Sequence, residues 1–271
     1  MKKINLLLSL VLLLGISLDA QAWGRREHAA VAYIAEQHLT PEAKATVNEI
    51  LGGRTMVYYA SWLDTYKKEM MLKIDKPYKD TGKCERTIPH TFKVTKNLKP
   101  RYQKYHEGLY IIEQSIEQLK DYRNLDDSTR MTAMQCLIHL VGDVHCPGHV
   151  IFADGRDKGI GKFDVTFFKK KTTMHKIWDS GFMNEAICGG VMDMAYMVDR
   201  ANEKQIAEIQ AGTVRDWGQD IIDRTKDMIW DVEEDAVLGK DYLTKYRDLG
   251  FDQIQRAGLR LAKVMNDLFT K

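Results

Sequence analysis

Residues 126–149, DDSTRMTAMQCLIHLVGDVHCPGH, contain the clearest structural signal in this sequence. Acidic and hydroxyl side chains that can cap a helix come first, apolar residues then recur at helical spacing, and Pro147 ends the pattern. His139 and Asp143 are four residues apart, so both side chains lie on one face of the predicted helix. Because imidazole and carboxylate are common zinc ligands, this face and His149 just after it form a candidate metal site.

The segments on either side of this helix predict a mainly α protein with minor β content. Residues 40–53 contain a capping Thr, a Pro at the first helical position and a Gly-Gly stop, and residues 102–122 carry apolar side chains at helical spacing. Residues 163–167 alternate like a short strand. Because no internal repeat, low-complexity linker or charge block divides the chain, we expect a single domain over residues 23–271.

The composition is that of an ordinary globular protein of 271 residues. Lys and Arg total 40 against 38 Asp and Glu, the formal net charge is +2, and 44% of the residues are hydrophobic. This balance excludes an acidic disordered chain and a broadly basic surface that binds nucleic acid through many phosphate contacts.

The first 22 residues have the pattern of a cleavable signal peptide. Two Lys residues precede an apolar run, residues 6–14, that is too short to span a bilayer, and Ala20-Gln21-Ala22 is a small-x-small cleavage site. This signature disfavours the alternative of an uncleaved anchor. We therefore expect a soluble protein, secreted or periplasmic, with no stable membrane association and a mature chain that begins at Trp23.

The cysteines leave two alternatives open. An exported chain with Cys84, Cys136, Cys146 and Cys188 can form up to two disulfides. Free thiols are equally compatible with the sequence, because a core of this size does not need covalent cross-links.

Further candidate ligands lie outside the predicted helix. His175 and Asp179 repeat the four-residue spacing, while Asp64 and His90 stand upstream. A lone His/Asp pair at this spacing is more often a surface hydrogen bond than a metal site. Two such pairs, with His149 directly after one of them, favour a hydrolase with more than one metal ion.

Trp23 adds a ligand that is unusual in proteins. Cleavage after Ala22 would give Trp23 a free α-amine, with an unperturbed pKa of about 8, five residues before His28. Such an amine can chelate a cation together with its own carbonyl oxygen. The simpler alternative, an aromatic residue that packs at the start of a helix, does not explain why Trp stands at the predicted cleavage site.

Taken together, these segments resemble the zinc-dependent single-strand nucleases, called the nuclease S-one/P-one family or type I nucleases. The matching motifs run in the family's order: Trp23-Gly…His28, Ala60-Ser-Trp-Leu-Asp64, Pro89-His90, His139 to His149, and His175-Lys-Ile-Trp-Asp179. The resemblance implies a helical domain of the zinc phospholipase C/P-one nuclease type that holds three zinc ions.

The resemblance also implies a ligand set for each ion. Trp23 and His28 would hold one zinc and share Asp64 with a second, which His90 and His139 complete. The third zinc would be held by His149, His175 and Asp179. Asp143 lies beside the second site and reaches towards the third.

The activity implied is hydrolysis of phosphate esters. Two zinc ions roughly 3.5–4 Å apart can bridge a hydroxide that attacks phosphorus in line. Asp64 would orient that hydroxide or act as its base, and Lys67 would stabilise the charged transition state. The resemblance implies an endonuclease of single-stranded DNA or RNA that also acts on 3′-nucleotides and leaves 5′-phosphates. We expect the protein to be a monomer.

The substrate-binding residues depart from the family pattern. Beside Lys67, we expect Phe92, Gly159 and Gly161 to contact the substrate. Thr91, Phe92 and Lys93 follow His90 where the family usually has an acidic residue, and Asp157-Lys-Gly-Ile-Gly161 replaces the usual Asp-x-Gly-Gly-Asn. The metal ligands are therefore predicted to be intact and the substrate site to be altered.

Two other functions stay open at this point. A zinc phospholipase C has a related fold and an N-terminal Trp, but such enzymes typically carry Glu four residues after the last His, where this chain has Asp179. A secreted binding protein that uses zinc only for stability is favoured by the altered loop, but structural zinc sites are usually mononuclear.

Overall fold

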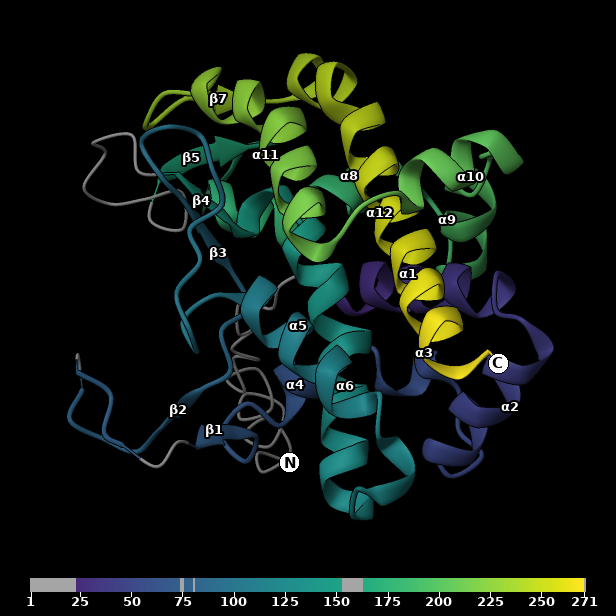
Figure 1. Cartoon of the computed structure of the whole chain (residues 1–271). Coiled ribbons are helices and arrows are strands. Elements are labelled where there is room, and N and C mark those ends of the chain that lie inside the picture. Colours follow the sequence, from purple (N-terminus) through teal and green to yellow (C-terminus); the bar gives the residue numbers. More distant parts are fainter. Residues whose placement is uncertain (1–22, 74–75, 80, 153–162, 271) are drawn as a thin grey trace, which may run out of the picture.

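The computed structural model describes residues 23–73, 76–79, 81–152 and 163–270. The predicted signal peptide, residues 1–22, and the predicted substrate contacts Gly159 and Gly161 lie outside the described residues. Helices make up most of the described chain and the strands are short (Figure 1), so the predicted mainly α fold with minor β content is confirmed.

The helix predicted from residues 126–149 is the element on which the site is built. It is α6, Asp127–His145, with Asp126 as its N-cap: the Asp126 carboxylate accepts a hydrogen bond from the Thr129 N–H at 3.0 Å. Residues 133–145 are all buried, and Pro147 opens the 3₁₀ turn Pro147–His149. The fully buried second half of α6 shows that other elements surround it on every side.

Four helices pack around one another to form the main core. The C-terminal helix α12, Lys240–Phe269, lies against α1, Arg25–Gln37, and against α6, while α5, Gly108–Leu119, packs on the other side of α6. Figure 1 shows α12 in yellow beside α6 in teal, with α1 in purple behind it. The first and the last helix of the described chain are therefore direct neighbours.

Further helices cover this core. Their bounds are α2 Pro41–Ile50, α3 Met56–Tyr59, α4 Trp62–Thr65, α7 Met174–Lys176, α8 Phe182–Ala186, α9 Val191–Val198, α10 Glu203–Gln210 and α11 Val214–Trp230, with a further 3₁₀ turn at Tyr122–Asn124. The predicted capping of α2 is confirmed, since the Thr40 hydroxyl accepts from the Ala43 N–H and Pro41 is the first helical residue. Gly52 and Gly53 follow it with positive φ values, which glycine adopts at little cost.

The helix predicted over residues 102–122 is shorter than expected. It begins only at Gly108, because the preceding segment pairs with a strand instead: the Arg101 N–H donates to the Lys93 carbonyl, and Tyr105 has a positive φ of 62° that interrupts a helix. The buried Glu107 carboxylate stabilises this arrangement by accepting from the Lys93 N–H at 2.8 Å and from Arg101 Nε at 2.7 Å.

The strands form three small sheets. Antiparallel β1, Met71–Lys73, pairs with β2, Glu85–Thr87; parallel β3, Phe92–Val94, pairs with β4, Val150–Phe152; and β5, Asp164–Phe167, lies between β6, Lys170–Thr173, and β7, Val237–Leu238. The strand predicted at residues 163–167 is thus confirmed as β5. The β3–β4 pairing matters for the site, because it brings together the segments that follow His90 and His149.

Two further expectations concern covalent links and the membrane. All four cysteines are free thiols, so of the two alternatives that the sequence left open, the structure has the second. Among the residues that the structure describes, no helix combines the length and the apolar character that crossing a membrane requires.

Candidate metal centre

Asp143 lies at the centre of a buried group of histidines. Its Oδ2 is 2.7 Å from His90 Nδ1 and 3.0 Å from His139 Nε2, while its Oδ1 is 3.3 Å from His28 Nε2 and 3.4 Å from His149 Nδ1. These four imidazoles come from α1, the segment before β3, α6 and the turn after α6. The tertiary fold therefore gathers residues that are widely separated in the sequence around one carboxylate.

Asp64 faces the same group from the short helix α4. Its Oδ1 is 3.8 Å from both His90 Nδ1 and His139 Nε2. Two sets of three ligand atoms, each within 4.8 Å of one another, result from this arrangement: His28, Asp64 and His139, and His90, His139 and Asp143. His139 belongs to both sets, so the two positions share ligands.

A second carboxylate group lies at the other end of the cluster. Asp179 Oδ1 is 3.5 Å from His149 Nε2, and Asp179 Oδ2 is 3.2 Å from His175 Nε2. The His149 and His175 rings stack with centroids 5.0 Å apart. Asp179 belongs to a π-helical turn, Ile177–Gly181, a wide turn that is frequent at functional sites. His149 is the residue that connects this group to Asp143.

Backbone carbonyls fix the orientation of three imidazoles. His139 Nδ1 donates to the Ala60 carbonyl at 2.7 Å, His149 Nδ1 to the His90 carbonyl at 3.0 Å, and His175 Nδ1 to the Gly148 carbonyl at 2.8 Å. Each of these bonds turns Nε2 of the same ring towards a carboxylate of the cluster. A carbonyl that accepts from the second ring nitrogen is the usual support of a metal-ligating histidine.

Close packing helps to position the His28 ring. Its ring stacks on His139 with centroids 4.1 Å apart, and a Cβ at Gly142 would lie only 2.9 Å from His28 Nδ1. Glycine at position 142 therefore lets α6 approach α1 closely enough for this ring to reach Asp143.

The cluster contains buried polar atoms that no protein group satisfies. They are both ring nitrogens of His28, Oδ2 of Asp64, and both carboxylate oxygens of Asp143 and of Asp179. The nearest imidazole nitrogens lie at ion-pair distance from the oxygens of Asp143 and Asp179. Unpaired buried carboxylates are costly, and metal ions are a common reason for retaining them. The residues present thus fit the oxygen and nitrogen ligand set of zinc.

The pKa values reflect this cost of burial. Burial raises the pKa of the Asp179 carboxyl to about 8, and burial lowers the pKa of the His28 imidazole to about 4. Both shifts favour the uncharged form, because the interior solvates charges poorly. His28 is therefore neutral near pH 7, which is the form that binds a metal.

Trp23 also lies at the cluster. Its side chain is fully buried, its indole N–H has no partner, and the Gly24 N–H donates to the Asp179 carbonyl. This position is compatible with both interpretations of Trp23, a packing residue and a ligand through its backbone.

With this geometry established, a comparison with known families decides the class of the protein. A model of the S1/P1 nuclease family matches residues 23–270, nearly all of the chain. The chain belongs to the S1/P1 nuclease family.

Individual S1/P1 nuclease relatives are similar over much of their length. Nuclease S1 of Aspergillus oryzae is 26% identical over 271 aligned residues, which cover 89% of each chain. Endonuclease 4 of Arabidopsis thaliana is 23% identical over 93% of this chain and 90% of its own, and Nuclease P1 of Penicillium citrinum is 26% identical over 62% and 60%. The predicted family and enzyme class, a nuclease that hydrolyses phosphodiester bonds of nucleic acids, are confirmed.

Two of the residues predicted to bind the substrate of this S1/P1 nuclease, Lys67 and Phe92, differ in their exposure to solvent. Lys67 is exposed, and its positive charge opposes the rise that burial causes in the pKa of the Asp179 carboxyl. Phe92, by contrast, is fully buried on β3, so a role in binding substrate does not fit this structure. The alternation of β3 turns Phe92 and Val94 into the core and leaves Lys93 exposed.

Two features near the site were missed in the sequence. The Cys146 thiol forms a third group of ligand atoms with His149 and Asp179, again within 4.8 Å of one another. A row of aromatic rings also lies on the outer side of α3 and α4: Trp62 is 6.1 Å from Tyr58 and 4.2 Å from Tyr66 between ring centroids. The four-residue spacing of these aromatic residues is the signal that could have revealed the row.

The remaining histidines have structural partners. His38 Nε2 is 3.0 Å from Asp199, and the fully buried His145 is 2.9 Å from the Arg260 guanidinium. These contacts give both histidines a structural role.

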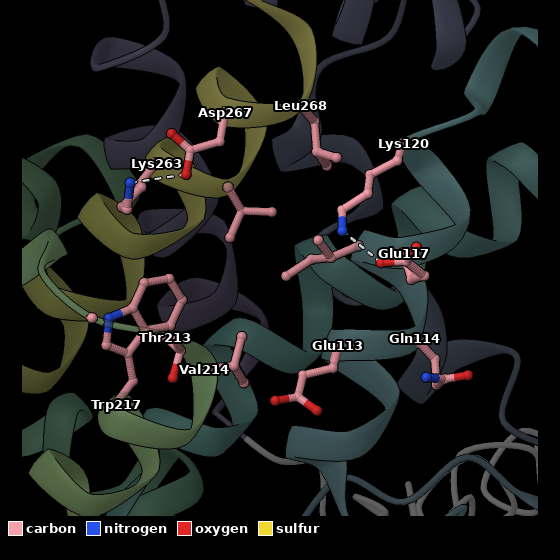
Figure 2. A pocket seen from close by; sticks show the side chains of 13 residues that line it. Glu113, Gln114, Glu117, Lys120, Thr213, Val214, Trp217, Lys263, Asp267 and Leu268 are labelled. Atoms are coloured by element: carbon pink, nitrogen blue, oxygen red, sulfur yellow. Dashed lines mark hydrogen bonds and ion pairs between the residues drawn. The ribbon is translucent and has the colours of Figure 1, made fainter.

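A large cavity elsewhere in the S1/P1 nuclease domain is separate from the histidine cluster. It has a volume of about 690 Å³ and lies between α5, the start of α11 and the end of α12 (Figure 2). Trp217, Val214 and Leu268 line it together with Lys120 and Lys263. None of the predicted metal ligands borders this cavity, so it is not part of the candidate centre.

Proposed function

We propose that this S1/P1 nuclease is an exported, zinc-dependent endonuclease of single-stranded DNA or RNA that also hydrolyses 3′-nucleotides and leaves 5′-phosphates. The observation that carries the proposal is the buried cluster of histidines and unpaired carboxylates in a chain of this family. The pattern of residues 1–22 supports export through a cleaved signal peptide.

Three zinc ions would be held by nine residues. Trp23, through its amine and carbonyl, and His28 would hold one ion; Asp64, His90 and His139 a second; His149, His175 and Asp179 the third. The 3.3 Å distance from His28 to Asp143 favours Asp143, more directly than Asp64, as the carboxylate shared by the first two ions. When bound, zinc ions lower the pKa of water and neutralise the charge of a phosphate ester.

Two side chains at the site would act on the reacting groups. Asp64 Oδ2 is buried and has no partner, so this oxygen is available to accept a proton from the attacking water and to orient it. The exposed Lys67 ammonium would approach the substrate from outside the cluster and balance charge that builds up on the phosphate oxygens. The proton taken by Asp64 would then leave to solvent.

The aromatic row of Tyr58, Trp62 and Tyr66 would hold the unpaired bases of the strand. Tyr58 is 51% exposed and Tyr66 is 38% exposed, and the Arg54 guanidinium lies 4.3 Å from the centre of the Tyr58 ring. Stacked aromatic side chains with cations beside them bind single strands without sequence preference. Trp62, the middle residue of the row, belongs to α4, the short helix that also carries Asp64. A strand bound along the row would therefore lie near the metal ligands.

The test is to express the chain with residues 1–22, so that export sets the N-terminus, and to measure zinc per chain and phosphate-ester hydrolysis. We expect three zinc ions and cleavage of single-stranded DNA, RNA and 3′-AMP, with no cleavage of phosphatidylcholine. Hydrolysis of phosphatidylcholine alone would favour the phospholipase alternative. Zinc binding without any phosphate-ester cleavage would contradict the proposal and favour a binding protein stabilised by zinc.

A variant with one added Met before Trp23 tests the N-terminal ligand. The extra residue converts the Trp23 amine into an amide, which is a poor metal ligand, so we expect one zinc ion fewer per chain and loss of most activity. Metal content should be compared with that of the exported protein by elemental analysis. Unchanged zinc content would show that the Trp23 amine is not a ligand.

A further inference from the structure

Cys146 occupies a position between the two carboxylate groups of the cluster. It is the residue after α6, three residues beyond Asp143 and three before His149, and its side chain is fully buried. Its sulfur lies within 4.8 Å of ligand atoms of both His149 and Asp179. The sulfur therefore lies close enough to His149 and Asp179 to share a metal ion with them.

We propose that Cys146 is a thiolate ligand of the metal ion held by His149 and Asp179. This inference rests on the proposed zinc centre and goes beyond its nine-residue ligand set. When the metal binds, the S–H bond breaks, its proton is released to solvent, and a sulfur–metal bond forms. Neither the sulfur nor the metal is oxidised or reduced.

Independent contacts at this position support a metal rather than a protein partner. Both Asp179 oxygens are buried and accept no hydrogen bond, so the sulfur faces a carboxylate whose nearest partners are the imidazoles of His149 and His175. The present contact of the thiol is weak, with 3.6 Å from Sγ to the Trp178 carbonyl.

A sulfur ligand would change which metal ions the site prefers. Thiolate is a soft ligand, whereas imidazole and carboxylate suit harder ions, so exchange of one ligand for sulfur shifts the preference towards soft cations. Cadmium binding at the His149–Asp179 position should therefore be strengthened relative to a site that has only nitrogen and oxygen ligands.

Cys136 provides a matched control within the same helix. It is also buried on α6, but its thiol contacts Ser115 and belongs to none of the three ligand groups. Free cysteines are often small core residues with no further role. If Cys146 is only such a residue, then Cys146→Ser and Cys136→Ser should behave alike towards metals.

The experiment is reconstitution of the exported chain with Co²⁺, which shows an intense near-ultraviolet charge-transfer band when thiolate is a ligand. The exposed Cys84 and Cys188 are replaced by Ser in all samples, to remove adventitious thiolate. We expect the band in this background and in its Cys136→Ser variant, and its loss in the Cys146→Ser and Cys146→Ala variants. Cys146→Ser should also weaken Cd²⁺ binding by at least about tenfold.

The outcomes separate the two proposals. Absence of the band from the Cys84→Ser/Cys188→Ser background, or its persistence in a Cys146→Ser variant, would overturn the role of Cys146 whether or not the variants fold well. If the band is absent but the chain still cleaves single-stranded DNA, the proposed function is retained and only the role of Cys146 is excluded. A Cys146-dependent band in a chain that cleaves no phosphate ester would support the role of Cys146 and contradict the proposed nuclease function.

Discussion

Asp143 is the single residue that touches most of the candidate centre, since its two oxygens face four histidines. We expect Asp143→Asn to remove at least one zinc ion and to lower kcat/KM on single-stranded DNA by at least about a hundredfold. Residues that only orient metal ligands already change metal affinity or activity by roughly 10–100-fold, and Asp143 would be a ligand itself. Elemental analysis and nuclease kinetics provide the measurement.

Asp127 provides the control for this variant. It lies at the exposed start of the same helix, where it contacts Arg130, so Asp127→Asn should leave zinc content and activity unchanged. Wild-type zinc content in Asp143→Asn would contradict the shared-ligand assignment.

From the sequence, the residues that bind metal ions can be predicted better than which of them bind the same ion. His139, Asp143, His175 and Asp179 could be identified because their four-residue spacing is visible within one segment. That Asp143 also faces His28 depends on how closely α1 and α6 approach each other, and no local pattern encodes that distance. The burial of Phe92 was missed for a similar reason, because it depends on which side of β3 packs on the core.

Among the elements, α3 and α4 carry the row of exposed aromatic rings. We expect Tyr58→Ala and Tyr66→Ala each to lower kcat/KM on long single-stranded DNA by roughly 5–150-fold, since stacking contributes about 1–3 kcal/mol per base. Hydrolysis of 3′-AMP should change little, because a single nucleotide at the metal centre does not extend to the row. Equal losses on both substrates would show that the substitutions disturb the centre itself.

A second group of interactions joins α6, α11 and α12 behind the centre. The buried Arg260 guanidinium lies 2.9 Å from His145 Nε2, donates to the Asp220 carboxylate at 2.6 Å, and donates to the Ile209 carbonyl at 3.0 Å. We expect Arg260→Ala to lower the free energy of unfolding by about 3 kcal/mol, because it leaves the buried His145 Nε2 and the Ile209 carbonyl without their donor and removes one ion pair of Asp220. Urea unfolding measures this change.

Arg224 gives the comparison for Arg260. It also pairs with Asp220, at 2.9 Å, but its side chain is 38% exposed, so Arg224→Ala should cost no more than about 1 kcal/mol. A similar loss in both variants would mean that burial does not decide the strength of these ion pairs.

The elements themselves were predictable to different degrees. The starts of α2 and α6 follow from Thr40 and Asp126, whose capping is local in sequence. The start of α5 does not, because the preceding residues are drawn into contact with β3 by the Arg101–Glu107 pair and backbone bonds to Lys93. Apolar spacing alone cannot reveal such a competing tertiary contact.

For the whole molecule, metal ions should contribute to stability as well as to catalysis. Zinc that binds only the folded chain at a free concentration of about 100 times its Kd adds about 2.7 kcal/mol, or roughly 5–10 °C in Tm. We therefore expect a chelator to lower Tm by at least this amount, measured by thermal unfolding with and without added Zn²⁺. The effect should be smaller in Asp143→Asn, and equal Tm values with and without chelator would argue against a buried metal centre.

The packing of α1 against α12 has a consequence for the order of events during biogenesis. His28 is carried by α1, which packs against α12, the last helix of the described chain. Residues 240–269 are synthesised long after His28 and Asp143, so α1 lacks this support while most of the chain is being made. We therefore expect chains truncated before α12 to hold His28 less firmly beside Asp143 and to retain fewer metal ions.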